Sequence, residues 1–309
     1  MQPGELPPLI VICGPTATGK TGLSLELAER LPGAEIISAD SRQVYRGMDV
    51  GTAKVGGADR ARVPHHGLDL VDPDEAFTAA DFRRDAMAAL AGIGARGGVA
   101  LLVGGTGLYV RAVARGLPLD ATGRDPALRA DLEARHAADG LPLLVAELRR
   151  VAPTVAAETD LANPRRVIRA LERAAVTGDR PPPAATGYPA PVLWLGLSTE
   201  PEDHTRWIVE RVRSQFEHGL VEEAADLRAR YPEDLRAFSA VGYREAFDLL
   251  AGRLDRDAAI ARTVARTRSY AKRQRTWFRA EPDVRWLPTG EGSRSSAARE
   301  SVAAFLAAV

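Results

Sequence analysis

Cysteine is nearly absent from this sequence, because Cys13 is the only one among 309 residues. A single thiol excludes an intrachain disulfide and a cluster of thiolate metal ligands. Cys13 lies in an apolar run, and we expect it to fill space in the core.

Long apolar runs are missing as well. No stretch approaches the ~20 residues that a membrane-spanning helix needs, and the N-terminus, which carries Glu5 and several prolines, lacks the basic start of a signal peptide. We therefore expect a cytoplasmic protein that does not contact a membrane. The length allows one large domain or two smaller ones.

Lysine is scarce, with Lys20, Lys54 and Lys272 as the whole set, and nearly all other basic residues are arginines. The 41 basic and 41 acidic residues cancel, which argues against a protein that coats nucleic acid indiscriminately. An average of this kind can still hide a local basic surface. Because the arginine bias reflects genome base composition, arginine abundance alone is no sign of RNA binding.

The string GPTATGKT follows the apolar run Leu9–Cys13 and precedes a helical pattern. Strand, glycine-rich loop and helix in this order predict a phosphate-binding loop, whose backbone N–H groups point at an anion. Lys20 supplies a mobile cation, and the Thr21 hydroxyl suits Mg²⁺. The predicted diphosphate-binding residues are Gly14, Pro15, Thr16, Ala17, Thr18, Gly19, Lys20 and Thr21.

The order of elements predicts an α/β fold, with a P-loop parallel sheet, helices on both of its faces and a helical insertion. Strands are expected at residues 9–13, 35–39, 99–103 and 192–197, and helices dominate to about residue 280. Residues 117–190 form the predicted insertion, and residues 1–116 and 191–309 form the core domain. The Gly/Ser-rich residues 290–296 are expected to be a flexible joint.

Asp40 and Thr106 follow two of the expected strands. The carboxyl ends of parallel strands face the ligand crevice, so both side chains should lie beside the loop. Asp40 is a candidate general base, and a helix N-cap or turn residue is the alternative. The strand before Thr106 ends in glycines where a nucleotide hydrolase has an acid, which argues against an ATPase.

Two basic stretches suggest a polynucleotide substrate. Arg165, Arg169 and Arg173 share one helical face, and residues 262–279 carry seven basic residues with interleaved aromatics and no acid. An ordinary solvated arginine face is the alternative for the first stretch. The adjacent His65 and His66 have no suitably spaced partner for a metal, so we expect them to form structural hydrogen bonds.

The motifs together resemble the tRNA dimethylallyltransferase family, also called isopentenyl-tRNA transferases. The resemblance covers most of the chain in the family's order. It is carried by GPTATGKT at 14–21, ISADSRQVYRGMDVGTAK at 37–54, PHHGLD at 64–69, FTAADF at 77–82, LLVGGTGLYVRA at 101–112, NPRRVIRALE at 163–172, GLVEEA at 219–224, VGYREA at 241–246 and TRSYAKRQRTWFR at 267–279.

This resemblance implies transfer of a dimethylallyl group from dimethylallyl diphosphate to N6 of the adenosine 3′ of the anticodon in tRNA. Asp40 and Thr106 match catalytic residues, and Thr21 is the implied Mg²⁺ ligand. The family arginine expected at Trp207 is missing, which leaves Arg211 as the diphosphate contact from that helix. The implied tRNA contacts are Asp40, Ser41, Arg42, Gln43, Arg129, Arg165, Arg166, Val167, Ile168, Arg169, Gly242, Tyr243, Arg244, Arg273, Gln274, Arg275 and Trp277.

The implied partners are the tRNA anticodon stem-loop and dimethylallyl diphosphate, with Mg²⁺ as cofactor and a monomer as the working form. Two alternatives remain open on the sequence. A P-loop small-molecule kinase would contain the same loop and would turn over ATP. A non-catalytic RNA-binding P-loop protein would use the loop as a nucleotide switch, and Asp40 would then be dispensable for tRNA modification.

Overall fold

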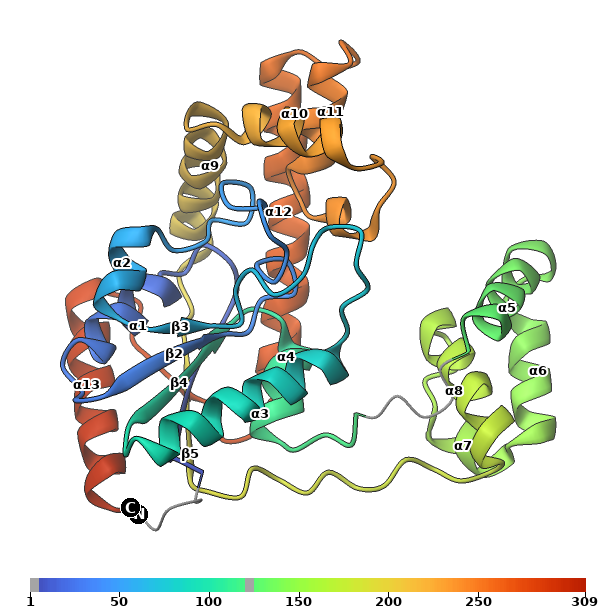
Figure 1. Cartoon of the computed structure of the whole chain (residues 1–309), viewed down its shortest axis with the longest axis horizontal. Helices are drawn as coiled ribbons and strands as arrows, with labels where there is room; N and C mark the ends of the chain where they lie inside the picture. Colours follow the sequence, from blue (N-terminus) through green and yellow to red (C-terminus); the bar gives the residue numbers. More distant parts are fainter. Residues whose placement is uncertain (1–5, 120–124) are drawn as a thin grey trace. The chain divides into compact units, whose positions relative to one another are not determined.

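The computed structural model describes residues 6–119 and 125–309. Within these residues, the strands form one parallel six-stranded sheet in the order β3-β2-β4-β1-β5-β6 (Figure 1). The strands are β1 (Leu9–Cys13), β2 (Ala34–Ser38), β3 (His65–His66), β4 (Val99–Gly104), β5 (Val192–Gly196) and β6 (Arg285–Trp286). The predicted α/β fold with a parallel sheet is confirmed.

The central strands consist of apolar runs because both faces of the sheet are covered. Successive side chains of a strand point to opposite faces. Leu9, Val11 and Cys13 of β1 belong to one hydrophobic cluster, and Ile10 and Ile12 belong to another. Each face of the sheet therefore has its own core.

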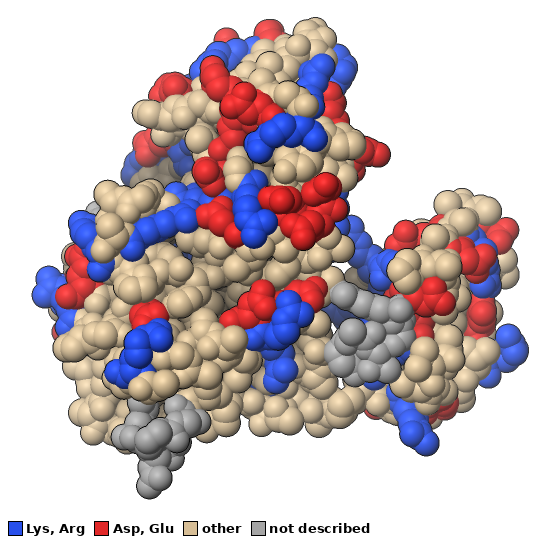
Figure 2. Space-filling model, in the orientation of Figure 1, with Lys and Arg blue, Asp and Glu red and all other residues tan. Residues whose placement is uncertain are grey.

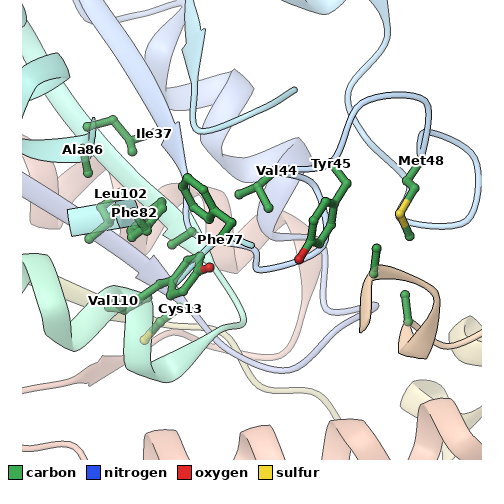
Figure 3. Close-up of a cluster of buried hydrophobic side chains, with 14 of the residues drawn as sticks. Cys13, Ile37, Val44, Tyr45, Met48, Phe77, Phe82, Ala86, Leu102 and Val110 are labelled. Carbon is green, nitrogen blue, oxygen red and sulfur yellow. The ribbon is translucent and has the colours of Figure 1, made fainter. Parts of the chain in front are cut away.

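The larger core lies between the sheet and helices α3 (Ala79–Ala95) and α4 (Gly107–Ala114) and continues under the helices that follow β5. Figure 3 shows part of it, with Phe82 of α3, Val110 of α4 and Leu102 of β4 around Cys13. The Phe82 and Tyr109 rings stack at 4.2 Å. As expected, Cys13 is buried there as a small apolar side chain.

The smaller core lies on the other face, under α1 and α13, which run along the same side of the sheet in Figure 1. The helices are α1 (Lys20–Ala28), α2 (Gly57–Arg62), α3 (Ala79–Ala95), α4 (Gly107–Ala114), α5 (Pro126–Asp139), α6 (Leu141–Val151), α7 (Pro153–Glu158), α8 (Pro164–Thr177), α9 (Pro201–Glu217), α10 (Leu220–Arg230), η1 (Arg236–Ser239), α11 (Tyr243–Leu250), α12 (Arg256–Arg279) and α13 (Glu291–Ala307). No helix among residues 6–119 and 125–309 is long and apolar enough to cross a membrane.

The chain divides into two compact units. Unit 1 comprises Met1–Leu117 and Thr186–Val309, and unit 2 comprises Pro118–Ala185. Unit 2 contains α5–α8 around its own small core of leucine, valine, isoleucine and alanine side chains. The predicted insertion extends to residue 190, but the end of its return segment belongs to unit 1. Tyr188 packs in the core of unit 1, and its hydroxyl donates to the Pro7 carbonyl at 2.9 Å.

The prediction of a flexible joint at residues 290–296 is wrong. This segment is the beginning of α13, whose Ala298 and Val302 are buried against the sheet. Glycine and serine lower helix propensity, but packing of an apolar face outweighs propensity. The edge strand β6 was also not predicted, since two exposed residues give no periodic signal.

Candidate active site

The loop between β1 and α1 has the backbone that its glycines predict. Gly14 has φ +146°, and a Cβ there would lie 2.5 Å from the Leu197 carbonyl oxygen. Gly19 precedes α1 in a left-handed conformation, and Ala17 has φ +58°, which is unfavourable for a residue with a side chain. Backbone held in sparsely populated regions is typical of ligand-binding loops. The helix beginning at Lys20 has no side-chain cap, so its first N–H groups are available to an anion.

Two buried side chains from other helices fix the start of this loop. The Gln274 amide accepts from the Thr16 N–H at 2.8 Å and donates to the Gly105 carbonyl at 2.9 Å. The His204 Nε2–H donates to the Thr16 carbonyl at 2.8 Å. Gln274 of α12 and His204 of α9 therefore join the loop to the end of β4 and to the helices after β5.

Lys20 and Arg211 bring two cations to the cavity beside the loop. The Lys20 ammonium donates to the Pro15 carbonyl at 2.6 Å. Burial and then the Arg211 guanidinium lower the pKa of Lys20 to about 8, although Asp40 opposes this shift. Arg211 donates to the Thr52 carbonyl at 3.4 Å. A pair of crowded cations of this kind is a favourable site for an anion.

Asp40 lies where the strand-end argument predicts, whereas Thr106 is not among the residues that line the cavity. Asp40 lines the same cavity as Lys20 and Arg211. One of its oxygens, Oδ1, accepts from the Arg42 N–H at 2.8 Å, so the turn function considered for Asp40 is also present. The Thr106 hydroxyl accepts from the Ser41 N–H at 3.0 Å, and therefore joins β4 to the segment after β2.

The cavity has a volume of about 240 Å³ and is lined by both polar and apolar residues. The polar lining includes the loop, Lys20, Asp40 and Arg211. The apolar lining includes Ile36, Val55, Leu68 and Val103, with Tyr270 also present. An anionic end and a small apolar end of one ligand would find matching surfaces here.

The turn at residues 48–54 forms part of the wall and is held by Glu223 of α10. The Glu223 carboxylate accepts from the N–H groups of Asp49, Val50 and Gly51 at 2.8, 2.7 and 3.0 Å. It also accepts from the Tyr243 hydroxyl at 2.6 Å. Sequence reasoning missed Glu223, although three N–H groups on one carboxylate form a strong anchor.

Several predicted tRNA contacts in unit 1 have other partners in the structure. Tyr243 is completely buried and Gly242 is buried beside it, so a side-chain contact of Tyr243 with RNA does not fit this position. Gln274 is also buried, because it holds the loop described above. Arg275 donates to His204 Nδ1 at 2.9 Å. Their observed bonds hold the loop and the elements around the cavity.

The remaining predicted contacts in unit 1 differ in exposure. Arg244 and Arg273 are exposed, and the Arg273 guanidinium lies 5.7 Å from the Tyr270 ring. Arg42 donates to Arg236 and Ala237 carbonyls and to the Ser239 hydroxyl. Gln43 donates to the Thr52 carbonyl at 3.1 Å. Ser41 lies beside Asp40, and Trp277 is half-buried with Arg111 4.8 Å from its ring.

In unit 2, the predicted contact stretch of α8 contains both exposed and buried positions. Arg165 and Arg166 are exposed, whereas Val167 and Ile168 are buried in the core of the unit. The two apolar side chains therefore pack the helix, and their burial does not fit a side-chain contact with RNA. Arg129 and Arg169 both pair with the buried Glu172, at 3.2 and 3.6 Å. Figure 2 shows lysine and arginine interspersed with acidic residues on the drawn face.

The two adjacent histidines make the structural bonds expected of them. His65 bonds the Val63 carbonyl at 2.7 Å, and His66 bonds Glu35 at 2.7 Å. Among the residues that the structure describes, no group of three or more histidine, cysteine, aspartate or glutamate side chains is arranged to hold a metal ion.

A phosphate-binding loop on a parallel sheet, with a carboxylate and two cations at one cavity, defines an α/β P-loop enzyme. A family model described as IPP transferase matches residues 43–281, well over half of the chain. The chain therefore belongs to the IPP transferase family, and the resemblance found in the sequence is confirmed.

Individual relatives agree with this assignment. A tRNA dimethylallyltransferase from Geobacter metallireducens is 45% identical over 294 residues, covering 93% of this chain and 94% of the relative. The full-length tRNA isopentenylpyrophosphate transferase from Bacillus halodurans has a TM-score of 0.72 at 39% identity, covering 97% of this chain and 96% of that one. A eukaryotic dimethylallyltransferase solved in snapshots of its action on tRNA has a TM-score of 0.80 at 25% identity, covering 96% and 78%.

Proposed function

We propose that this protein transfers the dimethylallyl group of dimethylallyl diphosphate to N6 of the adenosine immediately 3′ of the anticodon in tRNA and releases diphosphate. The observation that carries the proposal is one cavity in which the phosphate-binding loop, Lys20 and Arg211 face Asp40. The family and the names of its relatives indicate the same reaction. Because the proposed substrate is tRNA, we propose that the protein acts in the cytoplasm. All four elements come from one chain, which supports a monomer as the working form.

The cavity suits a diphosphate ester. The diphosphate would bind the N–H groups of the loop, and the five-carbon chain would lie against apolar side chains of the lining. The family match, and not the loop itself, disfavours a small-molecule kinase.

The reaction requires one bond to form and one to break. The exocyclic nitrogen attacks C1 of the dimethylallyl group, and the C1–O bond breaks with its electron pair going to diphosphate. An adenine amino group is a poor nucleophile because its lone pair is delocalised into the ring. Asp40 accepts the proton from this nitrogen, and Lys20, Arg211 and the N–H groups of the loop stabilise the charge on the leaving diphosphate.

Mg²⁺ fits the donors on this cavity. Thr21 and Asp40 present oxygen atoms there, and Mg²⁺ usually takes one or two protein oxygens together with phosphate oxygens and water. Thr21 would hold the ion through its hydroxyl. When bound, the ion neutralises charge on the diphosphate.

The target adenine must leave the stacked anticodon loop, which costs a few kcal/mol. We propose that exposed arginines offset this cost by binding phosphates of the stem-loop, with Arg165 and Arg166 acting from unit 2 and Arg244 and Arg273 from unit 1. Thr106 and Ser41 would keep Asp40 at the mouth of the cavity.

Asp40→Asn tests the proposed base. Asparagine keeps an oxygen that can accept from the Arg42 N–H, so the turn survives, but it cannot take up the proton. We expect transfer of label from radiolabelled dimethylallyl diphosphate to unmodified tRNA to fall by roughly 10²-fold or more, while tRNA binding is unchanged.

Asp59→Asn is the matched control, because it removes a surface carboxylate that pairs with Arg62 on α2. This control should keep full activity. Normal transfer by the Asp40 variant would disprove its role as base. ATP turnover by the wild-type protein without prenyl transfer would instead support the kinase alternative.

A further inference from the structure

Arg294 at the beginning of α13 is a buried arginine that reaches the phosphate-binding loop. The residue is 6% exposed. Its Nη1 donates to the Thr18 carbonyl at 3.0 Å, and its Nη2 donates to the Ser198 carbonyl at 3.3 Å and the Thr289 carbonyl at 2.9 Å. Nε donates to the Pro288 carbonyl at 3.3 Å. Arg294 lies outside residues 43–281, so the family match does not cover it.

The bond from Arg294 to the Thr18 carbonyl helps to set the orientation of the loop. A loop whose N–H groups face an anion turns its carbonyls outward, and a buried carbonyl needs a donor. Arg294 supplies this donor to Thr18, in the middle of the loop. Its Nη1 also lies close to Gly19, since a Cβ built there would be 3.3 Å from it. The guanidinium therefore lies directly behind the last turn of the loop before α1.

We propose that Arg294 is a positioning residue for the diphosphate. It fixes the Thr18 peptide so that the loop presents its N–H groups to the cavity, and it adds a positive charge behind them. This inference rests on the proposed function, because it assigns Arg294 to the same diphosphate site. It also gives α13 a function beyond covering one face of the sheet.

Docking of α13 does not depend on Arg294 alone. Arg299 of the same helix donates to Glu26 of α1 at 2.8 Å, and Ser295 donates to the same carboxylate at 2.6 Å. Ala298 and Val302 add apolar contacts in the smaller core. The helix therefore has separate anchors, and Arg299 offers a matched control on the same element.

The experiment compares wild type, Arg294→Lys, Arg294→Gln and Arg299→Gln. Calorimetric titration gives the Kd of inorganic pyrophosphate with Mg²⁺, filter binding gives the Kd of tRNA, and thermal unfolding gives Tm. A lost hydrogen bond to a charged group corresponds to about tenfold or more in binding. We expect Arg294→Gln to raise the pyrophosphate Kd by about this factor, Arg294→Lys to raise it less because it keeps the charge, and neither to change the tRNA Kd.

Arg299→Gln should leave the pyrophosphate Kd within about twofold, because it removes a partly exposed ion pair. Wild-type pyrophosphate affinity in both Arg294 variants would overturn the positioning role and leave the proposed function intact. An equal rise in the tRNA and pyrophosphate Kd with a lower Tm would overturn it as well, since the residue would then be merely structural. No pyrophosphate binding by wild type would overturn both proposals.

Discussion

His204 is a neutral histidine whose protonation would disturb the loop. Its Nε2–H faces the Thr16 carbonyl and its Nδ1 accepts from Arg275. A second ring proton would point at a guanidinium. Burial lowers the pKa of His204 from its ordinary value, with smaller contributions in the same direction from Arg275 and Lys20, although the bond to Thr16 opposes them. The tautomer is thus fixed by its two neighbours.

The lowered pKa makes stability depend on pH in a definite direction. In the unfolded chain the histidine takes up a proton near its ordinary pKa of about 6.5, whereas the folded protein resists that proton. Stability is therefore lost as the pH falls through this value. We expect Tm to fall more for wild type than for His204→Gln between about pH 7.5 and about pH 5.5. Parallel Tm curves for the two proteins would contradict this prediction.

Sequence patterns identify the residues of the site better than their partners. Asp40 and the loop follow from strand ends and glycine spacing, and both line one cavity, whereas Thr106 bonds to Ser41 beside Asp40. Arg129 and Arg169 carry no sign in the sequence that they flank the buried Glu172. Gln274 likewise gives no local signal, because its two partners are more than 160 residues away along the chain.

Among the elements, the turn at residues 48–54 depends most clearly on one side chain. Glu223→Gln removes the charge that three N–H groups share and leaves fewer acceptor sites for them. We expect the free energy of unfolding to fall by roughly 1.5–3 kcal/mol. The KM for dimethylallyl diphosphate should also rise, since Thr52 of this turn holds Arg211.

The neighbouring Glu222→Gln provides the control, because Glu222 is exposed on the same turn of α10. Chemical denaturation and initial rates of transfer measure the two effects. Equal stability and KM in the two variants would mean that Glu223 does not hold the wall of the cavity.

The elements themselves were predicted to different degrees. The central strands β1, β2, β4 and β5 were placed to within one residue at each end, because burial on both faces demands an uninterrupted apolar run. The beginning of α13 could not be predicted, since its helix depends on contacts with the sheet and on Arg294. Long-range packing overrides local composition in such segments.

At the scale of the whole molecule, the cavity and one part of the proposed tRNA contact belong to different units. Arg165 and Arg166 lie on unit 2, and the cavity lies on unit 1. Replacing both arginines with alanine should weaken tRNA binding and leave the pyrophosphate Kd unchanged. If each contacts one phosphate, the slope of log Kobs against log salt should become less steep by about 1.5–2.

Arg149 and Arg150 form a matched pair, because they are adjacent, exposed and also in unit 2. Their double alanine variant should keep the wild-type salt slope. Filter binding at several salt concentrations separates the two variants, and an identical slope in both would remove Arg165 and Arg166 from the interface.

The two segments that connect the insertion to the core domain are hydrogen-bonded to each other. The Thr186 N–H bonds the Gly116 carbonyl at 3.2 Å, and the Gly187 N–H bonds the Arg115 carbonyl at 3.1 Å. Both ends of the insertion are therefore fixed by hydrogen bonds within unit 1. Because these two hydrogen bonds lie within unit 1, replacing the residues between them with a short loop should leave the fold of the core domain intact.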